Sequence, residues 1–247
     1  MILPEEDNRR NMRVTDRVGG VPDIERVISD YEQYYREVPG YRDDLNRLIA
    51  GYSRGDSAKE LRTAYEFAVQ KVLAADPKMQ AKYGEGVHVF THRGNAAEIF
   101  RNEIVLLSFG LCLRGSREDA ATLLQCGERG DPILEVLARA CASGLEVEAG
   151  APAYPKPFDG LYDATTAPEK ALAECIATYL QSWYDVKMEG FSFKGNHLVE
   201  NSGYAGYWCV EAAGMVVALG IDDRTFADHP LYPRDLVAFF RASGKGR

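Results

Sequence analysis

The sequence lacks an apolar run long enough to cross a membrane. Its longest strongly apolar stretch outside residues 204–219 runs from Ile104 to Leu113 and is interrupted by Ser108 and Gly110. A membrane-spanning helix needs about 20 predominantly apolar residues. The first residues also lack a basic start followed by an apolar segment, so we expect neither a secretory signal nor a membrane partner.

Paired cysteines are missing as well. The chain has five cysteines, an odd number, and none of them forms a Cys-x-x-Cys pair. All five lie in apolar stretches of helical character, and free buried thiols in a reducing cytoplasm explain them best. We therefore predict a cytoplasmic protein without disulfides or structural zinc. The cysteines are Cys112, Cys126, Cys141, Cys175 and Cys209.

Recognisable catalytic motifs are also absent. The sequence contains no Gly-x-Ser-x-Gly elbow, no Walker A motif and no Rossmann glycine fingerprint. His88 and His92 would share one face of either a helix or a strand, but two ligands without a third make a poor zinc site. No pair of carboxylates has a spacing that distinguishes a general acid from a base. We predict that the protein is not an enzyme and uses no catalytic residue, metal or cofactor.

Basic residues are scarce in the second half of the chain. The net charge is −8 over 247 residues; residues 1–127 hold 20 acids and 18 bases, whereas residues 128–247 hold 17 acids and 11 bases. A nucleic-acid binder needs a basic stripe, so a nucleic-acid partner is not expected. A basic protein partner would explain the acidity, and so would selection for solubility alone.

Helix signals dominate the remainder of the sequence and predict an all-α fold, a multi-helix bundle without a significant sheet. Ser57 and Glu60 form a capping box for a long helix that Asp76-Pro77 should end. Thr166 and Glu169 form a second capping box for a helix running to about Met188. The other predicted helices cover about 22–38, 41–54, 95–114, 131–141 and 234–241. Only residues 84–92 alternate like a strand, and we interpret them as an extended connection.

Residues 204–219 carry no charge except Glu211. A helix that is apolar on every side is a buried helix, so we predict that this segment is the centre of the bundle and that Gly220 ends it. A buried carboxylate must be paired, hydrogen-bonded or neutral. Glu211 is either a structural anchor, tied to an arginine, a tyrosine hydroxyl or a helix N-terminus, or a carboxylate at the floor of a functional cleft.

Glycine and proline spacing suggests the domain organisation. Residues 1–20 are predicted to be a flexible leader, residues 21–143 an N-terminal helical region, residues 144–158 a Pro/Gly-rich connection and residues 159–247 a C-terminal helical region. The two helical regions are expected to form one compact unit.

Several segments together resemble a known family. The sequence Gly206-Tyr-Trp-Cys-Val-Glu211 is followed by Asp222-Asp223 and by Tyr232-Pro-Arg-Asp-Leu236, with Tyr179-Leu-Gln-Ser-Trp-Tyr184 upstream. Together they resemble the C-terminal region of the PoNi-like immunity proteins over roughly residues 131–240. Tyr52-Ser-Arg-Gly55 gives a looser N-terminal match. We interpret as structural signature residues Gly206, Tyr207, Trp208, Glu211, Trp183, Tyr232 and Pro233.

The resemblance implies an all-helical cytoplasmic antitoxin that binds and blocks a DNase toxin of the PoNe type, delivered between bacteria by type VI and related secretion systems. An acidic surface would then occlude the basic DNA-binding cleft of the toxin. The chain would be a monomer or a weak homodimer. The candidate toxin-binding acids are Glu189, Glu200, Asp222, Asp223, Asp228 and Asp235.

Two other functions compete with this hypothesis. A metal-dependent hydrolase could be built around Glu211 and neighbouring aspartates, and it would contain a bound metal. An adaptor or chaperone for a secreted effector would stabilise its client without abolishing the client's activity.

Overall fold

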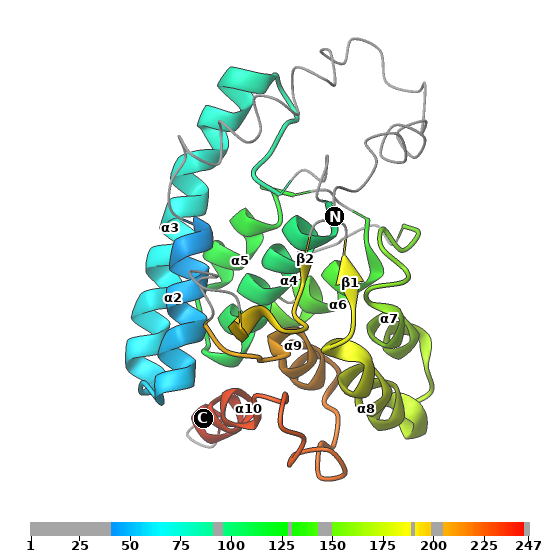
Figure 1. Ribbon diagram of the computed structural model, residues 1–247. Coiled ribbons are helices and arrows are strands. Elements are labelled where there is room, and N and C mark those ends of the chain that lie inside the picture. Colours follow the sequence, from blue (N-terminus) through cyan, green and yellow to red (C-terminus); the bar gives the residue numbers. More distant parts are fainter. Residues whose placement is uncertain are drawn as a thin grey trace.

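The computed structural model describes residues 41–90, 96–127, 130–142, 150–188, 191–198 and 205–244, and in this part of the chain the fold is all-α, as predicted (Figure 1). The predicted leader and the helix predicted over 22–38 lie outside the described residues. The described residues also contain a small two-stranded sheet, which the sequence did not predict. The elements in order are α2 (Tyr41–Arg54), α3 (Ala58–Tyr83), α4 (Ala96–Cys112), α5 (Arg117–Leu123), α6 (Pro132–Cys141), α7 (Asp159–Thr166), η1 (Glu169–Ala171), α8 (Leu172–Trp183), β1 (Lys187–Met188), β2 (Phe191–Ser192), η2 (Asn196–Leu198), α9 (Val210–Leu219) and α10 (Arg234–Ser243).

Two helices, α4 and α9, share the centre of the bundle. Every residue from 99 to 113 is buried, and α9 is buried from Val210 to Val216. The two helices pack on each other, and α6, α8 and α10 surround α9. In Figure 1, α2 and α3 lie along one side of this pair, α7 and α8 along the other, and α10 below. The sequence assigned the centre of the bundle to residues 204–219 alone. In the structure, a helix of the N-terminal region, α4, shares that position with α9.

The predicted central helix starts later than expected. α9 begins at Val210, and residues 205–209 have no regular secondary structure, while Tyr204 lies outside the described residues. Gly206 has a φ of 124°, which no right-handed helix contains. The N–H of Cys209 donates to the carbonyl of Leu231 at 2.9 Å instead of to a helical partner. The end of the helix is as predicted, because Gly220 takes the left-handed conformation.

The capping box of α3 is confirmed, but the predicted end of that helix is wrong. Ser57 and Glu60 cap each other's backbone, and the helix then runs through Pro77 to Tyr83. Proline removes one N–H but keeps a helical φ, so a helix continues past it when other contacts compensate. Here the Asp76 carboxylate accepts hydrogen bonds from Gln80 Nε2 at 2.9 Å and from the Val89 N–H at 3.0 Å.

The second capping box does not form. Thr166 is the last residue of α7, a helix that the sequence did not predict, and its hydroxyl donates back to the Asp163 carbonyl at 3.5 Å. Pro168 is extended, and a 3-10 turn leads into α8 without a side-chain cap. α8 ends at Trp183 rather than near Met188, because β1 and β2 pair antiparallel there. Among the described residues, no helix is long and apolar enough to cross a membrane.

Candidate functional site

Glu211 lies at the centre of a buried hydrogen-bond cluster. Its side chain has no exposed surface, and its Oε1 accepts from Trp183 Nε1 at 2.7 Å, Arg101 Nε at 3.2 Å and the Tyr179 hydroxyl at 3.3 Å. Trp183 and Tyr179 come from α8 and Arg101 comes from α4. One oxygen thus joins three helices. This geometry matches the structural-anchor interpretation, in which an arginine and a tyrosine hydroxyl hold the carboxylate.

Aromatic rings enclose the positive partner of this cluster. The Arg101 guanidinium lies 4.6 Å from the Phe193 ring centre and 5.6 Å from that of Trp183, and these two rings stack at 3.9 Å. Burial raises the pKa of Tyr179 well above its usual range, and the charge of Glu211 adds to the shift. The tyrosine therefore stays a neutral donor. The other carboxylate oxygen of Glu211 is buried and has no hydrogen-bond partner among the residues that the structure describes.

The Gly-Tyr-Trp segment joins the C-terminal region to α2. The Ser53 hydroxyl donates to the Ala205 carbonyl at 2.6 Å, and Trp208 Nε1 donates to the Ser53 Oγ at 2.8 Å. The Trp208 ring meets Tyr52 edge-on at 5.0 Å. A Cβ on Gly206 would overlap Ser53 Oγ, so only glycine fits this crossing. Two widely separated sequence signatures, Tyr52-Ser53 and Gly206 to Trp208, therefore pack on each other.

The sequence predicted both aromatic residues of this segment to be buried, and that prediction is wrong. Tyr207 and Trp208 are half-buried, because the segment that carries them precedes the buried helix and is not part of it. The Tyr207 hydroxyl accepts the backbone N–H of His197 at 3.0 Å and lies 2.8 Å from His197 Nδ1. The Tyr207 ring also meets Tyr184 edge-on at 5.0 Å.

Tyr232 and Pro233 are buried, and they position α10. The Tyr232 hydroxyl donates to Asp223 Oδ2 at 2.9 Å, and Arg241 Nη1 donates to Asp223 Oδ1 at 2.7 Å. Burial raises the pKa of Tyr232 above its usual range, and the hydrogen bond to Asp223 adds to the shift. Asp223 is thus an internal anchor, with 6% of its surface exposed. The sequence suggested that Asp223 is an exposed toxin-binding acid, and the structure shows that it is buried.

The other candidate toxin-binding acids have different surroundings. Glu189 and Glu200 lie outside the described residues. Asp222 and Asp228 are exposed, but each is paired with an arginine: Asp222 with Arg224, and Asp228 with Arg234 at 2.7 Å. Asp235, in the first turn of α10, is exposed and forms no ion pair with the described residues.

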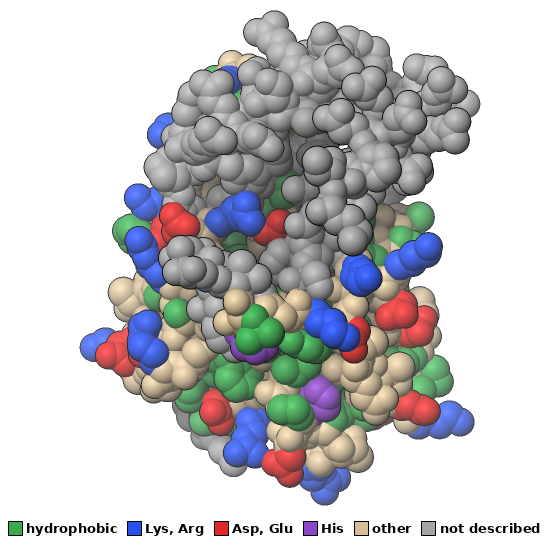
Figure 2. All heavy atoms as spheres, in the orientation of Figure 1, with side chains coloured by type: hydrophobic (Ala, Val, Ile, Leu, Met, Phe, Trp, Pro, Cys, Tyr) green, Lys and Arg blue, Asp and Glu red, His purple; other side chains and the backbone are tan. Residues whose placement is uncertain are grey.

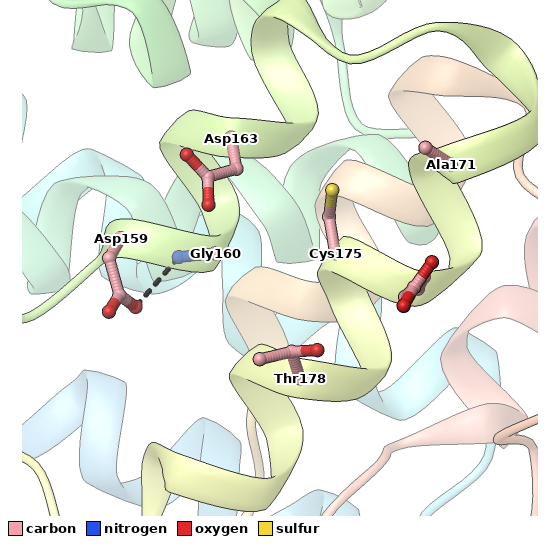
Figure 3. A pocket seen from close by; sticks show the side chains of 7 residues that line it. Asp159, Gly160, Asp163, Ala171, Cys175 and Thr178 are labelled. Carbon is pink, nitrogen blue, oxygen red and sulfur yellow. Dashed lines mark hydrogen bonds between the residues drawn. The ribbon is translucent and has the colours of Figure 1, made fainter.

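A groove between α7 and α8 carries acids that sequence reasoning missed (Figure 3). Asp159 and Asp163 come from α7, while Glu174, Cys175 and Thr178 come from α8. Asp159, Asp163 and Glu174 are exposed, and none of them forms an ion pair within the described residues. Asp159 accepts the N–H of Gly160 at 2.7 Å. The i,i+4 spacing of the two aspartates places them on one face of a helix. This signal could have been used only if residues 159–166 had been predicted to be helical.

Only one residue of the histidine pair lies within the described residues. His88 Nδ1 lies 3.0 Å from an oxygen of Asp76, and His92 lies outside the described residues. No group of three or more His, Cys, Asp or Glu side chains among the described residues could hold a metal ion. The described cysteines are free thiols.

Comparison with known proteins identifies a family that part of the chain resembles. Residues 129–236 match the model described as "PoNe immunity proteins (PoNi), C-terminal". The matched region is less than half of the chain and contains all the signature residues named above. The match supports an immunity role in general.

A solved structure shows the same fold. Protein PA2201 from Pseudomonas aeruginosa, whose crystal structure is known, superimposes with a TM-score of 0.65 at 23% sequence identity. The match covers 86% of this chain and 77% of that one, so it includes helices outside residues 129–236. No curated protein matches the chain.

Proposed function

We propose that this protein binds and inhibits a secreted antibacterial nuclease toxin of the PoNe type, in the cytoplasm of the cell that carries it. The observation that supports this function is the match of residues 129–236 to the C-terminal domain of PoNe immunity proteins. An acidic second half, with 17 acids against 11 bases, suits a partner whose DNA-binding cleft is basic. Delivery of the toxin by type VI secretion belongs to the same proposal.

The acids without ion pairs are the best candidates for guiding a basic toxin. Opposite charges on neighbouring arginines largely cancel the fields of Asp222 and Asp228 a short distance away. Asp163 and Glu174, on the α7–α8 groove, lack such partners among the described residues. We infer that this groove faces the rim of the toxin's basic cleft. The contact prediction for Asp235 stays part of the proposal.

A cleavage assay tests the function directly. The product of the adjacent gene is purified and incubated with plasmid DNA, with and without a stoichiometric amount of this protein. Inhibition should be complete at equal concentrations, because an antitoxin must bind with a long residence time. An adaptor would leave cleavage intact, and undiminished cleavage by a toxin bound to this protein would refute the inhibitor hypothesis.

A pair of charge-reversal variants tests the acidic surface. Asp163→Lys with Glu174→Lys and Asp222→Lys with Asp228→Lys change the net charge equally but at different places. At physiological salt, screening limits each effect to about 8 Å. The first variant should therefore slow association by about tenfold, and the second by much less. Stopped-flow association rates at several salt concentrations measure the difference. Equal rates for the first variant and the unmodified protein would contradict the assignment of the groove.

A further inference from the structure

An exposed apolar surface lies beside the Gly-Tyr-Trp segment. Among the described residues, two large apolar side chains are mostly exposed, Leu198 at 78% and Phe67 at 51%. Leu198 ends η2 and directly follows His197, which contacts the half-buried Tyr207. We call this surface the aromatic platform and define it as Tyr184, His197, Leu198, Tyr207 and Trp208. Figure 2 shows hydrophobic side chains gathered with histidines on this face, below the grey atoms.

The platform is held in place by tyrosine hydroxyls. The Tyr184 hydroxyl accepts the N–H of Gly195 at 2.9 Å, and the Tyr207 hydroxyl accepts the N–H of His197 at 3.0 Å. The Leu198 N–H donates to the Gly195 carbonyl at 2.9 Å. The exposed leucine therefore sits on a turn with fixed backbone. A preordered apolar side chain loses little conformational entropy on binding, which is the property of an interface anchor.

Unpaired negative charge borders the platform on two sides. Trp208 packs on Tyr52; burial raises the pKa of that tyrosine, and the charge of nearby Asp235 adds to the shift. On the other side, Tyr184 directly follows the last residue of α8, and Glu174 lies in the first turn of that helix. Ten helical residues span about 15 Å, so the α7–α8 groove and the platform fit within one interface of ordinary size.

We propose that the aromatic platform is the apolar centre of the toxin-binding surface, with Leu198 and the exposed parts of Trp208 and Tyr207 as its anchors. This inference rests on the proposed function and specifies where the toxin binds. Tryptophan and tyrosine are enriched among residues that dominate binding energy, and acids at the rim suit a basic partner. A second copy of this chain would bring a net charge of −8 against the same charge, which opposes self-association through this surface.

Truncation of the exposed leucine tests the platform with a matched control. Leu198→Ala removes an apolar side chain that makes few internal contacts, so the fold should not change. Phe67→Ala does the same on α3, where Lys71 lies over the ring at 5.0 Å. Binding to the adjacent-gene product is measured by surface plasmon resonance, and inhibition by plasmid cleavage. We expect dissociation to become about tenfold faster for Leu198→Ala and to be unchanged for Phe67→Ala.

Tyr207→Phe provides a second, independent measurement. It keeps the ring but removes the hydroxyl that holds His197, so it should also speed dissociation, by less than Leu198→Ala does. Near-ultraviolet circular dichroism and unfolding midpoints verify that each variant folds.

The outcomes separate the two proposals. If the unmodified protein inhibits the nuclease and Leu198→Ala dissociates at the same rate, the platform is refuted and the function stands. If the unmodified protein neither binds nor inhibits, the function is refuted and the platform with it. Sedimentation of the isolated chain gives a third outcome: a dimer that Leu198→Ala dissolves would assign the platform to self-association and overturn the inference.

Discussion

Replacing Glu211 by glutamine should destabilise the protein strongly although the side chain hardly changes in size. The amide oxygen can still accept from Trp183 Nε1 and the Tyr179 hydroxyl, now 2.7 and 3.3 Å from Oε1. The charge that balances Arg101 disappears, however, and Arg101 has only 6% of its surface exposed. Removing one partner of a buried ion pair costs about 3–5 kcal/mol, because the other charge stays buried without compensation.

The expected change in the unfolding midpoint follows from that energy. For a chain of this size, 1 kcal/mol lowers the midpoint by about 2–4 °C, so Glu211→Gln should unfold about 10 °C below the unmodified protein. Differential scanning calorimetry and urea titration measure the change. Asp222→Asn is the matched control: it is the same carboxylate-to-amide change at an ion pair with Arg224, but both partners are exposed. Its midpoint should stay where it is, because exposed pairs contribute little.

A double-mutant cycle tests whether an uncompensated buried charge causes the loss of stability. Arg101→Met should also destabilise, because it leaves Glu211 charged and buried. The double variant, Arg101→Met with Glu211→Gln, removes both charges, so it should be more stable than the sum of the single losses by about 1–3 kcal/mol. Strict additivity would refute the idea that an uncompensated charge causes the loss. A midpoint for Glu211→Gln equal to that of the unmodified protein would refute the role of Glu211 as an anchor.

Two further predictions concern backbone geometry and pH. Gly220→Ala should destabilise the protein by about 1–2 kcal/mol, the cost of placing alanine in the left-handed conformation. Gly206→Ala should destabilise it by more. Both glycines have positive φ, but a Cβ at Gly206 overlaps Ser53 Oγ, whereas nothing lies within 4 Å at Gly220. Equal unfolding midpoints of the two variants in calorimetry would show that Ser53 moves away from the added Cβ at no cost in stability. Burial raises the pKa of Cys126 and of Cys141 to about 12. The stability that these neutral thiols contribute is complete below the pKa of an unfolded cysteine, about 8.5, and is lost as pH rises towards 12. Urea midpoints should therefore fall between pH 9 and 11, and substituting both cysteines by alanine should flatten that fall.

Much of the fold was predictable because its signals are local. Ser57 caps its helix as predicted, since a capping side chain and its backbone partners lie within three residues of one another, and Asp131 caps α6 in the same way. Gly220 ends α9 for the same reason. The pairing of Glu211 with an arginine and a tyrosine could be anticipated in kind, because burial leaves a carboxylate few alternatives. Which arginine and which tyrosine could not be anticipated, because Arg101 is 110 residues away.

The errors arose where distant contacts override a local signal. Pro77 ends a helix in isolation, but contacts of Asp76 with Val89 and Gln80 hold the two turns together. The apolar pattern of residues 204–219 suggested one helix, yet Ser53 from α2 donates to the Ala205 carbonyl, and Gly206 has a positive φ that ends the helix pattern there. The pattern correctly indicated low polarity for these residues, but not their conformation.

The sequence by itself determined that this protein is an acidic all-α bundle with a carboxylate held in its core, because helical periodicity, capping and net charge are properties of neighbouring residues and of composition. Only the tertiary structure decided which acids are available to a partner. Asp223 is enclosed by Tyr232 and Arg241, whereas Asp163 and Glu174 lie open on a groove formed by two helices. Whether an acid can attract a partner protein depends on the side chains that folding places beside it, and those side chains come from elsewhere in the chain.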